Sequence, residues 1–262
     1  MSEKLPVSVY IITKNCEATL ALTLASVRDC AEVVLVDSGS TDRTLEIARA
    51  QGCRIWHQDW LGYARQKALA LSYCTQDWVL NLDGDEEASA ELLADIAACI
   101  ASDDADGLDI PIHDYFLGCP PAKNGRYNHR VRFFRKSAGS YDTGKEVHES
   151  ITVTGKVRTV AGGIRHYGEN TIRIKVDKTN AYSALAAAEK FAKGKQHSLV
   201  KLVLVMPLMF FKSYILRRNF LNGRRGFIGS MINAFYAFLK EAKLYELHLN
   251  RRLQGGKTSR ED

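Results

Sequence analysis

A chain of 262 residues, of which 46% are hydrophobic, is long enough to bury one large α/β core and carry an appended region. Its charge is uneven, because residues 1–110 contain 8 Lys and Arg against 19 Asp and Glu, whereas residues 111–262 contain 28 against 11. The net charge of +6 therefore comes from a basic second half, which predicts contact with an anionic partner.

Several classes of protein are excluded by motifs that the chain lacks. The six cysteines are widely spaced without a C-x-x-C pair, so we expect buried thiols in a reducing compartment, not a disulfide framework or a zinc site. G-x-G-x-x-G and G-x-x-x-x-G-K-[ST] are absent, which argues against dinucleotide enzymes and P-loop NTPases. The basic residues are mixed with long apolar runs, and no DNA or RNA module is recognisable, so a membrane surface fits better than nucleic acid.

Strand-like and helix-like segments alternate through the first hundred residues. Apolar runs rich in β-branched residues predict strands at residues 7–12, 32–36, 54–56 and 77–82. Apolar residues at helical spacing predict helices at 20–27, 43–51 and 64–73. This alternation predicts the α/β class, with a mostly parallel sheet and right-handed crossovers. Ligands bind such sheets at the carboxyl ends of the strands, and the polar residues expected there are Thr13, Asp37, Asp83 and Asp85.

Three acidic residues crowd into the segment Asp83-Gly84-Asp85-Glu86, directly after the last of these strands. Carboxylates so close together repel one another unless a cation lies among them, and hard divalent ions prefer oxygen ligands. The segment therefore predicts a site for a metal ion and a diphosphate. One alternative is a polar turn, with Glu86 and Glu87 preceding a helix that begins near Ala88. An EF-hand fits less well, because its sixth and twelfth positions would be Ala88 and Ala94.

The first hundred residues resemble the nucleotide-sugar-binding half of the GT-A glycosyltransferases of family 2. The resemblance rests on Ile11-Ile12-Thr13-Lys14-Asn15, Val36-Asp37-Ser38-Gly39-Ser40-Thr41-Asp42-Arg43-Thr44 and Leu82-Asp83-Gly84-Asp85-Glu86. It implies a GT-A, Rossmann-like fold, with a mostly parallel sheet and helices on both faces. It also implies transfer of a sugar from a nucleotide donor.

Further matches extend the resemblance over nearly the whole chain and narrow it to the β-1,4-glucosyltransferases that act on heptose in the lipopolysaccharide inner core. They lie at residues 60–67, 77–83, 132–135, 147–149, 166–167, 214–217 and 220–223. The subgroup implies an inverting enzyme that uses Mn²⁺ or Mg²⁺ to move glucose from UDP-glucose to a heptose. Transfer to another lipid-linked or protein acceptor stays open, as does an inactive nucleotide-sugar-binding module on the membrane.

Carried over residue by residue, the resemblance places the donor on five side chains. Thr13 and Asp37 would contact the nucleotide, and Gln66 and Lys67 would approach the pyrophosphate. Asp83 would hold the ribose or a metal-bound water. Simpler roles are open for three of these positions: Asp37 as a turn carboxylate, and Gln66 and Lys67 on an exposed helical face.

The metal and the catalytic base fall on other residues. The resemblance implies that Asp85 binds the metal directly and that His166 completes the metal site, although a lone histidine is often structural. An inverting transfer needs one carboxylate to take the proton of the acceptor hydroxyl. We expect Glu149 to be this base, with Asp142 and Glu146 as alternatives.

Apolar and basic residues are combined between positions 199 and 227. An uncharged run at 202–211 precedes five basic residues, Lys212, Arg217, Arg218, Arg224 and Arg225. Ten residues fall short of the roughly 20 that span a bilayer. We therefore expect a pair of helices lying at an anionic membrane surface, with packing against the catalytic domain as the alternative.

These segments predict the organisation of the chain. Residues 1–110 would form the nucleotide-sugar-binding half and 111–170 the half with the acceptor and the base; 171–253 would be a membrane-associating helical region and 254–262 a polar tail. Residues 1–6 lead into a strand without a signal-peptide pattern. We therefore expect a cytoplasmic enzyme, peripheral on the inner face of the cytoplasmic membrane, whose partners are a UDP-sugar and a lipid-anchored saccharide.

Overall fold

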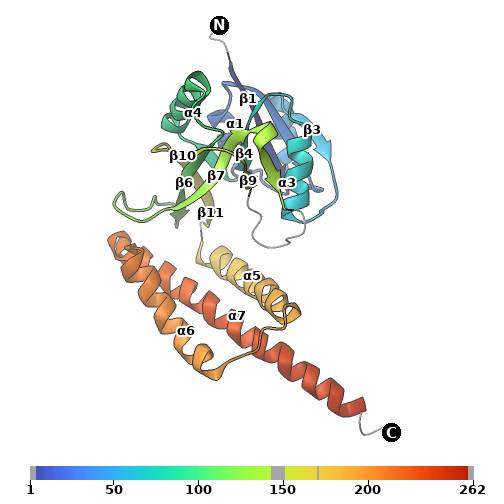
Figure 1. The fold of residues 1–262 in the computed structure, drawn as a ribbon, viewed down its shortest axis with the longest axis vertical. Coiled ribbons are helices and arrows are strands. Elements are labelled where there is room, and N and C mark those ends of the chain that lie inside the picture. The colour runs from blue at the N-terminus through green and yellow to red at the C-terminus, as the bar shows by residue number, and fades with distance from the viewer. Residues whose placement is uncertain (1–3, 143–150, 170, 259–262) are drawn as a thin grey trace. The chain divides into compact units, whose positions relative to one another are not determined.

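The computed structural model describes residues 4–142, 151–169 and 171–258. The chain forms two compact units, which are described separately. The sheet unit contains residues 1–115 and 127–168, and the helical unit contains residues 116–126 and 169–262 (Figure 1).

The first half of the sheet unit is parallel. Strands β1 (Leu5–Thr13), β2 (Cys30–Asp37), β3 (Arg54–His57) and β4 (Trp78–Asp83) lie in the order β3-β2-β1-β4, and each neighbouring pair is parallel. Residues Val7 to Thr13 of β1 are all buried, as expected of a central strand covered on both faces. The alternation of strands and helices in the sequence therefore predicted this half correctly.

The second half of the sheet mixes directions. It continues from β4 with β7 (Asn128–Arg135), β6 (Gly107–Phe116), β11 (Ile164–Glu169) and β5 (Glu86–Ala88), and β10 (Val157–Thr159) pairs with β6. Pairs β4–β7, β6–β7 and β11–β5 are antiparallel. A separate antiparallel pair joins β8 (Gly139–Tyr141) to β9 (Ile151–Val153). The α/β class is confirmed, and the sheet as a whole is mixed: the first four strands are parallel, and in the second half the pair β10–β6 is also parallel.

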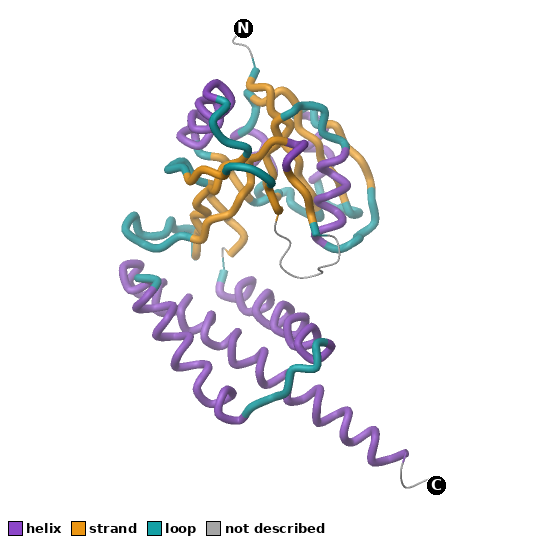
Figure 2. Tube along the Cα trace, in the orientation of Figure 1, coloured by secondary structure: helices purple, strands orange, loops and turns teal. Residues whose placement is uncertain are grey.

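Helices cover both faces of the sheet (Figure 2). Val9 and Ile11 of β1 belong to one apolar cluster, together with residues of α1 (Leu20–Ser26), α2 (Thr44–Ala50) and α4 (Ala90–Ser102). Tyr10 and Ile12 belong to a second cluster, with residues of α3 (Tyr63–Ser72). Because successive side chains of a strand point to opposite faces, this division confirms the predicted layers.

The segment after the acidic cluster is a strand. Glu86 to Ala88 form β5, and α4 begins at Ala90, where the hydroxyl of Ser89 accepts a hydrogen bond from the Leu92 N–H. A helix does begin near Ala88, as this alternative expected, but Glu86 and Glu87 lie in β5, so their assignment to a polar turn at the helix start is wrong. Pairing with β11 outweighs the local helix-start signal, because it places Glu86 inside the sheet unit.

The helical unit is built around one long helix. Helices α5 (Ile172–Ala192) and α6 (Leu199–Phe211) each pack against α7 (Gly223–Thr258), and a π-helical turn, Lys212–Leu216, continues α6. The carboxylate of Glu241 on α7 is buried and contacts the ammonium groups of Lys190 on α5, at 2.5 Å, and Lys201 on α6, at 3.5 Å. Since α7 extends to Thr258, it continues past position 253, where we expected a polar tail.

Two features of the helical unit were not expected. Loop 116–126, between β6 and β7, belongs to it, and the Ala122 N–H donates a 2.7 Å hydrogen bond to the side-chain oxygen of Asn222. The helical run Leu199–Leu216 is also long and apolar enough, judged by length and composition alone, to cross a membrane. Its 18 residues have a mean hydropathy of 1.9, so the ten-residue count underestimated this segment.

Candidate active site

The carboxyl ends of β1, β2 and β4 bring three of the predicted residues to one edge. In the sheet register Thr13 is the partner of Asp37, and Ile12 is the partner of Asp83. The edge predicted from the strand series is thus present. Each strand ends where its apolar run ends, because the polar side chains that follow need partners outside the core.

Asp37 organises the turn that follows β2. Its carboxylate accepts hydrogen bonds from the hydroxyls of Thr13 (3.2 Å) and Ser40 (2.5 Å) and from the N–H groups of Gly39 (2.9 Å) and Ser40 (2.8 Å). Gly39 has a φ of +85°, which a residue with a side chain rarely adopts. Asp37 therefore acts as a turn carboxylate in this structure, and its contact with a nucleotide stays a prediction.

Gln66 and Lys67 point into the protein from α3. Both are buried, so the alternative of an exposed helical face is wrong. The Gln66 amide donates to the Ser38 hydroxyl (2.9 Å) and the Gln58 carbonyl (3.1 Å), and the Lys67 ammonium lies 2.9 Å from Asp83 Oδ1. These contacts join α3 to the turn after β2 and to the end of β4.

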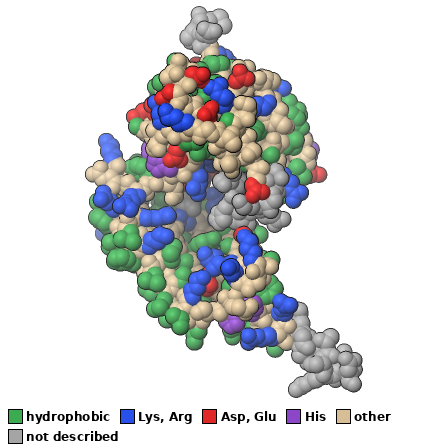
Figure 3. Space-filling view, in the orientation of Figure 1, with side chains coloured by type: hydrophobic (Ala, Val, Ile, Leu, Met, Phe, Trp, Pro, Cys, Tyr) green, Lys and Arg blue, Asp and Glu red, His purple; other side chains and the backbone are tan. Residues whose placement is uncertain are grey.

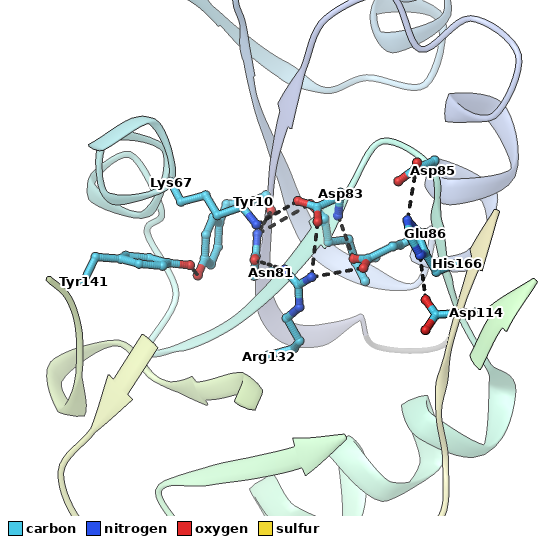
Figure 4. A network of polar contacts seen from close by, with 11 residues as sticks. Tyr10, Lys67, Asn81, Asp83, Asp85, Glu86, Asp114, Arg132, Tyr141 and His166 are labelled. Carbon is cyan, nitrogen blue, oxygen red and sulfur yellow. Dashed lines mark hydrogen bonds and ion pairs between the residues drawn. The ribbon is translucent and has the colours of Figure 1, made fainter. Parts of the chain in front are cut away.

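Arg132 of β7 joins two carboxylates of the acidic segment (Figure 4). Its Nη2 lies 3.2 Å from Asp83 Oδ2 and 3.0 Å from Glu86 Oε1, and its Nη1 also donates to the Asn81 side chain. The Asp83 N–H donates to Glu86 Oε2 at 2.9 Å. Arg132 lies in one of the sequence segments that resemble the family, but the sequence analysis gave it no role. Its burial, and with it the need for carboxylate partners, became visible only in the fold.

The two carboxylates respond differently to this environment. Burial alone would raise the pKa of Asp83, but Lys67 and Arg132 outweigh it and hold the pKa well below its usual range. For Glu86 burial dominates, and the negative charge of Asp83 adds to it, so its pKa is raised even though Arg132 opposes the shift. Asp83 is therefore ionised, and its carboxylate is paired with both nearby cations, Lys67 and Arg132.

Asp85 and His166 face each other beside this network. The Tyr167 N–H donates to the Asp85 carbonyl at 2.9 Å, which aligns β11 with the turn after β4. His166 Nε2 lies 3.6 Å from Asp85 Oδ2, and His166 Nδ1 lies 2.8 Å from Asp114 Oδ1. Burial lowers the pKa of His166, but hydrogen bonds to Asp114 and Asp85 outweigh it and raise the pKa to about 11. Asp114 was missed because it comes from the far end of β6.

Asp85 and His166 are the two side chains to which the resemblance assigns a divalent metal. Among the described residues, no group of three or more His, Cys, Asp and Glu side chains is arranged to hold a metal ion. Mg²⁺ in proteins binds one or two carboxylates and completes its coordination with water and substrate phosphates, so Asp85 suits such an open site, whereas an imidazole is preferred by softer ions. The hydrogen bonds to Asp114 and Asp85 that raise the pKa of His166 also keep its imidazole protonated, so a metal ion bound there would have to displace the Nε2 proton.

The predicted catalytic base lies outside the described residues. Glu149 and its alternative Glu146 lie in residues 143–150, outside the described part of the chain. Asp142, the other alternative, is exposed and follows Tyr141, whose hydroxyl lies 2.6 Å from the Tyr10 hydroxyl. The assignment of the base therefore stays a prediction.

The topology of the sheet, together with the acidic residues at the carboxyl ends of its strands, indicates the class of enzyme. A parallel four-stranded half joined to a half of mixed direction, with Asp83-Gly84-Asp85 at the end of β4, is the architecture expected of a GT-A glycosyltransferase. The family model "Glycosyl transferase family 2" matches residues 8–168. The chain belongs to this family and is a glycosyltransferase.

Known relatives extend over nearly the full length of the chain. The lipopolysaccharide core biosynthesis glycosyltransferase LpsC of Rhizobium meliloti is 36% identical over 258 residues, which cover 95% of each protein. An uncharacterized glycosyltransferase of Rickettsia typhi is also 36% identical and covers 94% of this chain and 89% of its own. Among solved structures, residues 1–349 of S. aureus TarS align with 95% of the chain at 18% identity and a TM-score of 0.48, a distant likeness.

Proposed function

We propose that this enzyme transfers glucose from UDP-glucose, with inversion, to a heptose of the lipopolysaccharide inner core. The choice of sugar and acceptor rests on the segments that resemble the inner-core glucosyltransferases, and the similarity to LpsC, a lipopolysaccharide core biosynthesis glycosyltransferase, supports the pathway. The acceptor is a saccharide anchored in lipid. The enzyme acts in the cytoplasm, peripheral on the inner face of the cytoplasmic membrane.

The observation that carries this proposal is the pair Asp85 and His166 beside an ion network that is already balanced. Lys67 and Arg132 are bound by Asp83 and Glu86, so their charges are not available to neutralise a departing diphosphate. A divalent ion held by Asp85 and His166 supplies that charge when bound. In this proposal Thr13 and Asp37, which end strands at the same edge, hold the nucleoside, and Asp83 holds the ribose or a metal-bound water.

The proton of the acceptor hydroxyl is taken by Glu149 in this proposal. Loss of a general base typically lowers the rate about 10²–10⁴-fold. Glu149→Gln should therefore reduce kcat while UDP affinity, measured by calorimetry, stays near wild type. A full kcat in this variant would transfer the role to Asp142 or Glu146.

The function is tested by release of UDP from UDP-glucose in the presence of purified heptose-terminated lipopolysaccharide. We expect UDP release that requires this acceptor, and core oligosaccharide lacking one glucose in a strain without the gene. Release with a different lipid-linked or protein acceptor would favour that substrate class instead. Binding of UDP-glucose without release under any of these conditions would identify an inactive membrane module.

A further inference from the structure

The helical unit exposes a continuous apolar stripe along α6. One face of α6 packs on α7, and every residue of α6 is at least partly exposed. The opposite face carries Val200 (68% exposed), Leu204 (47%), Leu208 (62%) and Phe211 (53%), and Val203 (63%) flanks them. The first four positions recur at the three-to-four-residue spacing of one helical face. Figure 3 shows hydrophobic side chains gathered over the part of the helical unit that contains α6.

The stripe continues around the turn that joins α6 to α7, where it meets basic residues. Ile215, Leu216, Phe220, Leu221 and Phe227 are each more than 40% exposed. Lys212, Arg217, Arg218 and Arg224 are exposed among them. Large exposed apolar patches mark interaction sites, and this combination of apolar area with cations matches the boundary between anionic headgroups and acyl chains.

The packing of α6 on α7 decides how this surface meets a bilayer. The ring of Phe210 lies 5.6 Å from that of Phe227, and Lys201 lies 3.5 Å from Glu241, so the two helices run antiparallel side by side. If α6 crossed the membrane, this part of α7 would cross with it. The turn with Arg217, Arg218, Arg224 and Arg225 would then be carried to the far side, against the preference of basic residues for the cytoplasmic side.

We infer that α6 lies in the plane of an anionic membrane surface, with the stripe from Val200 to Phe227 inserted below the headgroups and the basic residues of the turn contacting lipid phosphates. This inference rests on the proposed function only for the presence of a lipid-anchored acceptor. The occupant of the surface is the bilayer itself. A second copy of the chain would leave the cations of the turn facing one another, because the same patch on both subunits would carry them.

The test is flotation with vesicles of phosphatidylcholine and phosphatidylglycerol. Val203→Gln/Leu208→Gln should weaken binding about tenfold or more, because two exposed apolar side chains leave the acyl region. The matched control, Val176→Gln/Leu185→Gln, removes two exposed apolar residues from α5 and should bind like wild type. Circular dichroism should show both variants folded, since none of the four side chains is buried.

Each outcome has a definite meaning. Alkaline carbonate should release the wild-type protein from vesicles; resistance to carbonate would overturn the in-plane arrangement in favour of a spanning helix. Equal binding by both double variants would show that the stripe does not touch lipid. If Val203→Gln/Leu208→Gln lost a dimer that the wild-type protein forms in sedimentation experiments, while its vesicle binding stayed unchanged, the stripe would be assigned to contact with a second copy of the chain. Vesicle binding requires no sugar donor, so these results are independent of the proposed activity.

Discussion

Asp85 is the carboxylate of the acidic segment that remains available for a metal, because Asp83 and Glu86 are bound by Arg132. We therefore expect Asp85→Asn to lower turnover roughly 10²–10³-fold through loss of charge stabilisation by the metal. Chelation should inactivate the wild-type enzyme, and Mn²⁺ or Mg²⁺ should restore it. The UDP-release assay measures both effects. Full activity of the chelated enzyme would refute the metal proposal.

Arg132 forms an ion pair with the buried carboxylate of Glu86, so replacing Arg132 should lower the free energy of unfolding. Removing one partner of a buried ion pair typically costs about 3–5 kcal/mol, and we expect Arg132→Met to lower the free energy of unfolding by about 3 kcal/mol at pH 8. Without Arg132 the pKa of Glu86 in the folded protein rises further above its unfolded value. Such a group stabilises the fold below its unfolded pKa, and this contribution is lost as pH rises through the folded pKa.

The penalty of Arg132→Met should therefore be smaller at pH 5 than at pH 8. Urea unfolding at the two pH values measures this difference. Arg130→Met, which changes an exposed arginine of the same strand, is the control and should stay within about 0.5 kcal/mol of wild type. A penalty independent of pH would mean that Glu86 does not take up a proton when Arg132 is missing.

Strands β6 and β11 set the orientation of the metal-facing histidine. Asp114 near the end of β6 contacts His166 Nδ1 at 2.8 Å, which leaves Nε2 toward Asp85. Partners of this kind typically change metal affinity 10–100-fold, so we expect Asp114→Asn to weaken Mn²⁺ binding by about that factor. Calorimetric titration without donor measures it directly. Asp109→Asn, on the same strand but paired with His129, should bind Mn²⁺ like wild type.

The elements that the sequence predicted best are those with local signals. Strands β1, β2 and β4 each carry a continuous apolar run, and Thr13, Asp37 and Asp83 follow directly from where those runs end. The antiparallel half depends on pairings between distant segments, such as β7 lying between β4 and β6. Patterns of neighbouring residues do not encode that order.

The same distinction explains what was missed in the site. Arg132 meets Glu86 across 46 positions of sequence, and His166 meets Asp114 across 52. Glu86 also looked like a residue at a helix start, because the local pattern of Glu86, Glu87 and Ala88 gives no sign of its pairing with β11. Gln66 and Lys67 lie in a segment that resembles the family, which was only a weak sign of their burial. Their hydrogen-bond and ion-pair partners come from other elements, and those partners explain why the two side chains are buried.

At the scale of the whole molecule, we expect the basic residues of the turn between α6 and α7 to attach the enzyme to the membrane leaflet that holds its acceptor. Each contributes roughly 1 kcal/mol at an anionic surface, so changing Arg217, Arg218, Arg224 and Arg225 together to Gln should release the protein from anionic vesicles. Raising the salt concentration should weaken wild-type binding through screening. Hydrolysis of the UDP-sugar to water should stay near wild type in this variant. Unchanged co-sedimentation would contradict the membrane proposal and assign these arginines to an oligomer interface.

Loop 116–126 makes the two units inseparable by a single cut in the gene. The chain leaves the sheet unit after residue 115, returns at 127 and leaves again after 168. A chimera that exchanged residues 169–262 alone would deprive Ala122 of the Asn222 side chain and Phe116 of the ammonium of Lys175. A recombination that exchanged these helices would have to carry this loop with them, so we expect the loop and the helices to vary together among related chains.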